Sequence, residues 1–156
     1  MRFHFMLASA LALGFPVMAQ AQLLDAKLIS LAAAQKIVAA AQAEARRNNW
    51  NVSVAVVDAT GNLIAFEKMD DASWPSVDVA QGKARTAARY KRPTKALDSA
   101  VTAGRMQYLA FPGMLPVEGG IPVVIGGKVI GGVGVSGATS AQDAQMAQAG
   151  VNTITP

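Results

Sequence analysis

The stretch IPVVIGGKVIGGVGVS, residues 121–136, decides the fold of this chain. It predicts a strand over 121–125, a two-residue turn at Gly126-Gly127, and a second strand over 128–136. A two-residue turn joins antiparallel neighbours, because parallel strands need a much longer crossover connection. The stretch therefore predicts a β-hairpin.

Similar patterns on both sides of this hairpin complete one domain. The predicted helices begin at Ser30, Ser76, Thr94 and Ser140, and a second predicted hairpin joins strands over 52–57 and 63–68 through a turn at 58–62. The last helix opens on a segment, 140–143, that has the form of a capping box. Because the strands come in hairpins, the sequence favours an α+β domain with a mainly antiparallel sheet of about four to five strands flanked by helices.

The N-terminal 21 residues have the pattern of an export signal. Arg2 and His4 form a basic start, residues 5–18 are mostly apolar, and Ala19-Gln20-Ala21 is a small-x-small cleavage site. The apolar stretch is shorter than the about 20 residues that a transmembrane helix needs. We therefore predict cleavage to a mature domain over 22–156, with no membrane anchor and a periplasmic or secreted location.

The composition of the mature domain excludes several chemistries. Its sequence contains no cysteine, and the single histidine of the chain lies in the predicted signal. A Ser-His-Asp triad is thereby excluded, although Ser136 stands beside Gly137, and a metal site is disfavoured because only oxygen ligands are present. The net charge is mildly basic, +4 for the full sequence and +3 once Arg2 is removed with the signal, and points to an anionic small molecule as ligand. Export disfavours nucleic acid as a partner.

Residues 132–137 match G-x-G-x-x-G, the pattern of a dinucleotide-binding turn. Too little chain follows for the βαβ unit and the acidic residue that such a site requires. Strand alternation places Val129, Val133 and Val135 on one face and Gly132, Gly134 and Ser136 on the other. The bare glycine face is either a ligand floor or a place where a helix or subunit packs closely. The first alternative makes Gly134, Ser136 and Gly137 candidate ligand contacts.

The most basic stretch of the chain is 83–95. Within it, Arg85, Arg89 and Arg92 stand at helical spacing and form a stripe. One interpretation is a solvated helix face, because runs of charge usually serve solubility. The alternative is a rim that attracts an anionic ligand, with Lys83 and Arg89 as binding residues.

The segment 105–120 has no clear periodicity, and a connection of this length inside a small domain is often functional. It contains Arg105, Tyr108 and Glu118. If the fold gathers these side chains, the arginine would bind a carboxylate and the other two would act as acid and base. They are candidate catalytic residues for a cofactor-independent enzyme, a lyase or an isomerase, that acts on a small organic acid.

Several short motifs occur in a characteristic order. They are VAVVD at 54–58, GNL at 61–63, KMD at 68–70, KARTA at 83–87, PVEGGIP at 116–122, GKVIG at 127–131, GVSG at 134–137 and QD at 142–143. Together with a first helix over 31–45, these motifs resemble the GlcG/HbpS family of haem-degrading or haem-binding domains, which is also related to the C-terminal part of PduO-type proteins. The resemblance covers residues 28–153.

The resemblance implies a profilin-like domain that self-associates as a homo-oligomer and binds haem or another small ligand. PduO-type members use a histidine that the mature chain lacks. Haem iron would therefore be held by one of a few other side chains, or haem would be bound only through hydrophobic and propionate contacts. Those side chains are Thr86, Tyr90, Met106, Tyr108 and Met114. The full set of predicted ligand-binding residues is Lys83, Arg89, Tyr90, Phe111, Met114, Gly119, Gly120, Gly134, Ser136 and Gly137.

Three functions are compatible with the sequence. The first is an exported protein that binds haem, a related tetrapyrrole or another small anion. The second is the enzyme of organic acids described above. The third is an assembly protein without a ligand, in which the glycine face is an interface between subunits.

Overall fold

A four-stranded antiparallel sheet in the order β2-β1-β4-β3 forms the centre of the computed structural model, which describes residues 26–154. The elements are α1 (Leu31–Arg47), β1 (Ser53–Asp58), β2 (Leu63–Lys68), α2 (Ser76–Tyr90), α3 (Thr94–Thr102), the 3₁₀ helix η1 (Met106–Ala110), β3 (Gly120–Ile125), β4 (Lys128–Ser136) and α4 (Ser140–Val151). The predicted α+β fold is confirmed. The predicted signal, residues 1–21, lies outside the described residues.

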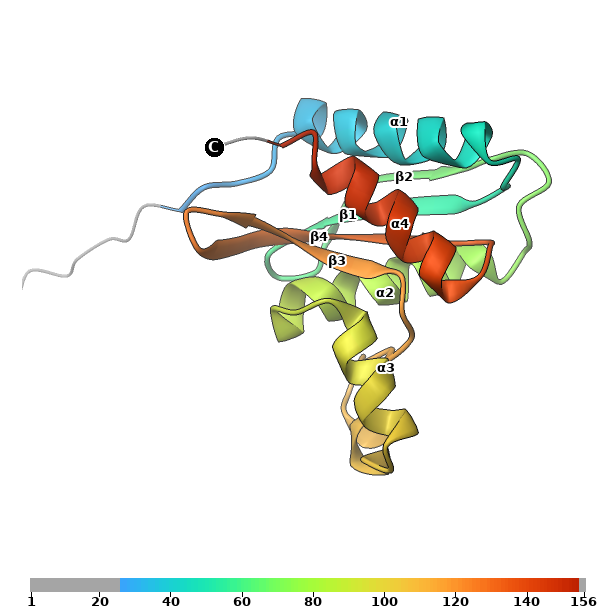
Figure 1. The fold of residues 1–156 in the computed structure, drawn as a ribbon. Helices are drawn as coiled ribbons and strands as arrows, with labels where there is room; N and C mark the ends of the chain where they lie inside the picture. Colours follow the sequence, from blue (N-terminus) through green and yellow to red (C-terminus); the bar gives the residue numbers. More distant parts are fainter. Residues whose placement is uncertain (1–25, 155–156) are drawn as a thin grey trace, which may run out of the picture.

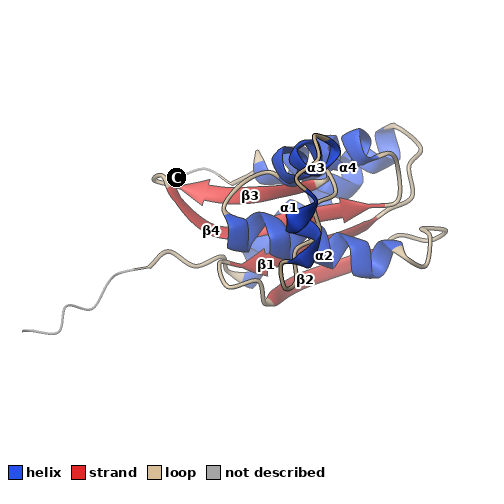
Figure 2. Ribbon diagram, turned by 90° about the horizontal axis from the view of Figure 1, so that it is seen from below, coloured by secondary structure: helices blue, strands red, loops and turns tan. Residues whose placement is uncertain are grey.

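The helices form layers on both faces of the sheet (Figure 1). Helices α1 and α4 pack together on one face, and α2 crosses the other face, as the view from below shows (Figure 2). Helix α3 and η1 extend away from the sheet as an arm (Figure 1). Within residues 26–154, no helix has the length and apolar character needed to cross a membrane.

The larger core lies between the sheet and the pair α1 and α4. Val52, Val54 and Val56 point into it, as their alternation in the sequence predicts, and they are fully buried. Ser30 begins α1, and its side-chain oxygen accepts a hydrogen bond from the Ala33 amide at 3.1 Å. The predicted start of α1 is therefore confirmed.

The other face of the sheet packs against α2 at very short range. Ala80, Ala84 and Ala88 of the helix are buried, and glycines of β4 lie opposite them. A Cβ atom on Gly134 would collide with the Ala80 carbonyl and lie 2.5 Å from the Ala84 amide nitrogen. Helix α2 therefore packs directly on the glycine face. Of the two alternatives that the sequence left open, close packing is the one that the structure shows.

Three details of the sequence interpretation are wrong. Ile130, rather than Val129, joins the larger core, because Ile130 is an extra residue between the β3–β4 pairs Val123–Gly131 and Val124–Val129. The capping box of α4 begins one residue earlier than predicted, with the Thr139 amide donating to Gln142 Oε1 at 3.1 Å.

The third error concerns the arginine stripe. Helix α2 ends at Tyr90, and Lys91 takes a left-handed conformation with φ of 54°. Arg92 therefore lies outside the helix, and the stripe consists of Arg85 and Arg89.

Candidate functional site

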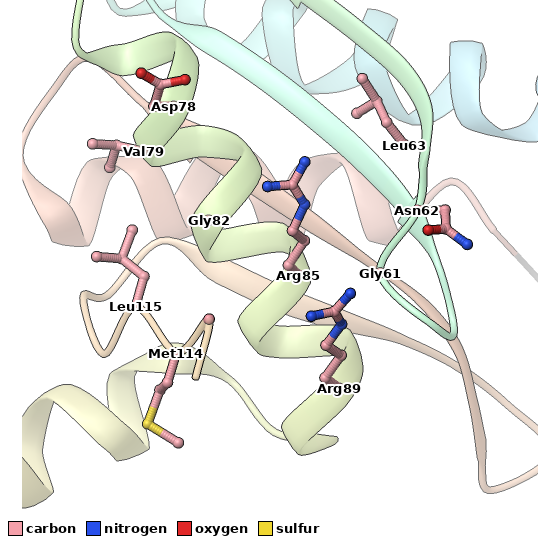
Figure 3. Close-up of a pocket in the computed structure, with 11 residues that line it drawn as sticks. Gly61, Asn62, Leu63, Asp78, Val79, Gly82, Arg85, Arg89, Met114 and Leu115 are labelled. Carbon is pink, nitrogen blue, oxygen red and sulfur yellow. The ribbon is translucent and has the colours of Figure 1, made fainter. Parts of the chain in front are cut away.

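An open cleft of about 650 Å³ lies over the solvent-facing side of α2 (Figure 3). Asp78, Gly82, Arg85 and Arg89 form its floor. These positions are spaced four, three and four residues apart, so they share one side of the helix, opposite the alanines that meet the sheet. The helix that is fixed by the glycine face therefore also forms the base of the cleft.

The turn between β1 and β2 forms one wall of the cleft, through residues 61–63. The Asp58 carboxylate organises this turn by accepting hydrogen bonds from the Thr60 hydroxyl and from the amides of Thr60 and Asn62. These bonds, with the Thr60 hydroxyl foremost, lower the pKa of Asp58 to about 2. Arg89 Nε donates to the Thr60 carbonyl at 2.7 Å and joins the turn to α2.

Residues 113–115 form the opposite wall. The Leu115 amide donates to Thr86 Oγ1 at 2.8 Å, which fixes this segment to α2. A Cβ atom on Gly82 would lie 2.8 Å from Leu115 Cδ2, so the absence of a side chain there lets the leucine approach the helix. Met114 lines the same wall, and Figure 3 shows it across α2 from the two arginines.

The two arginines give one end of the cleft a positive charge. Arg85 donates to Gln81 Oε1 at 3.2 Å, and Arg89 donates to the Thr60 carbonyl, so both guanidiniums bond to neutral groups. Among residues 26–154, neither takes part in an ion pair. Guanidiniums bind carboxylates and phosphates by paired hydrogen bonds. The cleft is therefore suited to an anionic group beside an apolar wall.

Lys83, a predicted ligand-binding residue, lies on the inner side of α2 and is 1% exposed. Its ammonium group donates to Asp143 Oδ2 at 2.7 Å and to the Val135 carbonyl at 3.1 Å. Burial raises the pKa of the Asp143 carboxyl, and the hydrogen bond and charge of Lys83 oppose that rise. This buried ion pair joins α2 to α4 and lies apart from the cleft.

The glycines and the serine that were predicted to contact a ligand also pack against other parts of the domain. A Cβ atom on Gly119 would lie 2.7 Å from Lys83 Nζ, and the Gly120 amide donates to Thr94 Oγ1 at 2.8 Å. Ser136 pairs with Ser53 across the sheet, and Gly137 lies against the Asn51 carbonyl. With Gly134 beneath α2, none of these five positions lines the cleft.

The three predicted catalytic residues lie at two different places. Glu118 forms an ion pair with Lys95 at 2.9 Å, and its amide donates to Asp98 Oδ2. The Arg105 guanidinium instead lies over the Tyr108 ring, 4.9 Å from the ring centre. The structure therefore does not unite a carboxylate clamp with an acid and a base.

Most of the other predicted iron contacts and aromatic contacts lie outside the cleft. Phe111 packs edge-on against Tyr108 in the arm, and Met106 is exposed there. Thr86 is buried and accepts the Leu115 amide, and Tyr90 stands in the last turn of α2. Arg89 and Met114 are the predicted ligand-binding residues that line the cleft.

Sequence reasoning did not assign most of the cleft. Arg85 was placed in the arginine stripe but not among the predicted binding residues. The residues that were missed altogether are Gly61, Asn62, Leu63, Asp78, Val79, Gly82, Gly113 and Leu115. The shared helical side of Asp78, Gly82, Arg85 and Arg89 is a signal that the sequence does contain. Residues 26–154 hold no group of three or more Asp, Glu, His or Cys side chains arranged for a metal ion.

Comparisons with known proteins agree on one family. The model of the family "Haem degrading protein HbpS-like" matches residues 29–152. Protein GlcG of Escherichia coli K12 is 48% identical over 109 residues, which make up 70% of this chain and 81% of GlcG. An uncharacterized 15.0 kDa protein of Citrobacter freundii is 40% identical over 124 residues, 77% of this chain and 87% of that protein.

Two solved structures have the same fold. A double mutant of HbpS from Streptomyces reticuli superposes with a TM-score of 0.81 and 34% identity, over 93% of this chain and 100% of that chain. A PduOC haem complex superposes with a TM-score of 0.76 and 29% identity, over 82% of this chain and 96% of that chain.

Proposed function

The chain belongs to the HbpS-like family, and from this premise we propose that it is a haem-binding protein whose ligand occupies the cleft over α2. The resemblance found in the sequence motifs is thereby confirmed at the level of the family. One observation carries the proposal: the cleft has two arginines beside an apolar wall. Within residues 26–154, neither arginine takes part in an ion pair. The haem complex of PduOC, which has the same fold, supports it.

The residues of the cleft fit the chemical parts of haem. Arg85 and Arg89 would hold the propionates by charge-assisted hydrogen bonds. Leu63, Val79 and Leu115 offer apolar surface to the macrocycle, and the volume of the cleft is typical of small-molecule sites. Met114 brings a thioether, which is an accepted axial ligand of haem iron. A bound haem would supply redox-active iron.

Replacing Arg85 by glutamine should weaken haem binding about tenfold, because one charge-assisted hydrogen bond to a propionate is lost. Arg85 is chosen because its partner, Gln81, is a side chain of the same helix, so the substitution leaves the β1–β2 turn intact. The measurement is a titration of the mature protein with haem, followed by the shift of the Soret band.

The matched control is Arg92→Gln, which removes the same charge outside the cleft and should leave the affinity unchanged. A second arm compares Met114→Leu with Met106→Leu, and only the first should alter the Soret spectrum. Absence of a saturable, stoichiometric Soret shift with the wild-type protein would disprove haem binding. Equal losses in Arg85→Gln and Arg92→Gln would place the ligand elsewhere.

We also propose that the protein acts in the periplasm or outside the cell, because residues 1–21 carry the features of a cleaved signal. Expression of the full sequence in a Gram-negative host should yield periplasmic protein whose first residue is Gln22, as read by N-terminal sequencing. The double substitution Ala19→Arg and Ala21→Arg should leave the precursor uncleaved. Recovery of unprocessed wild-type protein in the cytoplasm would contradict the proposal.

The predicted homo-oligomer stays a prediction. In its support, Met106, Leu109 and Phe111 are exposed on the arm formed by α3 and η1. Exposed apolar side chains that lie together on a soluble domain are typical of interaction surfaces.

A further inference from the structure

The floor of the cleft carries opposite charges at its two ends. Asp78 stands in the first turn of α2, and Arg85 and Arg89 stand in its second half. About 10 Å of helix separates Asp78 from Arg85, and about 16 Å separates it from Arg89. Figure 3 shows the aspartate and Arg89 at opposite ends of the helix.

No other side chain neutralises these charges within the described part of the chain. The ion pairs of residues 26–154 join Arg47 to Glu44, Lys83 to Asp143 and Lys95 to Glu118. Asp78 is exposed and is absent from all three. Gly82 lies between the acidic and basic ends, and Leu115 packs close over it. A ligand that spans the cleft therefore meets apolar surface between the two charges.

We propose that Asp78 determines the specificity of the cleft by admitting ligands with carboxylates at one end and rejecting ligands with carboxylates at both ends. The inference rests on the proposed function, since it concerns the ligand of the same site. A ligand carboxylate placed near Asp78 would meet a like charge at short range, which disfavours binding. Protoporphyrin carries both propionates on one edge, whereas uroporphyrin carries carboxylates on all four pyrroles.

A purely structural role for Asp78 predicts a different result. An acidic side chain in the first turn of a helix stabilises the helix dipole. Loss of that role would lower the melting temperature slightly and would change the affinities for both porphyrins equally. The ratio of the two affinities is therefore the decisive quantity.

The experiment measures the dissociation constants of metal-free protoporphyrin IX and of uroporphyrin I by fluorescence, at physiological ionic strength. Wild-type protein should bind protoporphyrin more tightly, and Asp78→Asn should shrink the ratio of affinities about tenfold, mainly by tightening uroporphyrin binding. The control Asp70→Asn removes an exposed carboxylate outside this cleft and should leave the ratio unchanged, because salt screens remote charges.

The outcomes separate the two proposals. An unchanged ratio in Asp78→Asn, with protoporphyrin still bound, would overturn the role of Asp78 and leave the proposed function standing. An equal change in Asp70→Asn would also overturn it, since the effect would then follow net charge. Failure of the wild-type protein to bind protoporphyrin would overturn the proposed tetrapyrrole site and, with it, the specificity that rests on it.

Discussion

Alanine at position 134 is expected to destabilise the domain by at least about 3 kcal/mol, enough to lower the melting temperature by about 10 °C or more. The added Cβ atom would meet the Ala80 carbonyl and the Ala84 amide, which are backbone atoms of α2. Backbone in a packed helix cannot rotate aside as a flexible side chain can, so the whole helix must move off the sheet. Thermal and denaturant unfolding of Gly134→Ala measure the loss.

Two companion variants test the stated cause. Adding Ala84→Gly to Gly134→Ala should bring no recovery, because the atoms in collision belong to the main chain. Gly126→Ala places a Cβ atom in open space and should cost only the about 1–2 kcal/mol of its left-handed backbone, φ 58°. A stable Gly134→Ala protein with an unchanged fold would refute the close seating of α2.

Replacement of Lys83 by methionine should destabilise the protein by about 3–5 kcal/mol at neutral pH, because Asp143 then remains buried without its cation. The Asp143 carboxylate would retain the Ala138 amide, at 3.1 Å, as a hydrogen-bond donor. One amide does not replace an ammonium group at 2.7 Å. Denaturant unfolding at pH 7 measures the difference from the wild-type protein.

The deficit should shrink as the pH is lowered from 7 toward 4. Burial raises the pKa of Asp143, and removal of Lys83 takes away the charge that opposes the rise. The folded variant therefore binds a proton at a higher pH than the unfolded chain does, so acid stabilises the folded state in this window. A deficit that stays constant over the window would show that lost packing, rather than the unpaired charge, causes it.

The double substitution Lys83→Met with Asp143→Leu separates charge from packing further. Apolar replacement of a buried ion pair is often neutral or stabilising, so the double variant should regain most of the stability lost by Lys83→Met. A double variant as unstable as the single one would contradict the assignment of the loss to the uncompensated charge.

Local patterns in the sequence predicted the framework of the domain well. Two strands, Leu63–Lys68 and Lys128–Ser136, have the predicted bounds, because a tight turn and a two-residue alternation define a hairpin within one short window.

Two of the three errors arose where two neighbouring residues compete for one role. Thr139 and Ser140 are both good caps, but Thr139 has Gln142 three residues later to complete the capping box. Asp143, which the predicted box of Ser140 required, is instead bonded to Lys83.

The cleft could not be predicted in the same way, because three separate segments form it. Arg89 was identified from its charge, but its contact with Thr60 depends on how α2 crosses the sheet. Met114 lines the cleft because the Leu115 amide bonds to Thr86, nearly thirty residues earlier. No local pattern contains such pairings. The same limit explains Lys83, whose charge suggested a surface role and whose partner on α4 lies 60 residues away.

Both sides of helix α2 have a structural or binding role. Its alanines and Lys83 pack against the sheet and α4, and its arginines line the cleft. Directed evolution of the ligand range should therefore succeed more often at Leu63 and Met114, which line the walls, than on the helix. A library randomised across α2 would mix variants that bind poorly with variants that fold poorly. Selection from such a library would first enrich variants that fold stably, and only later variants that bind the new ligand.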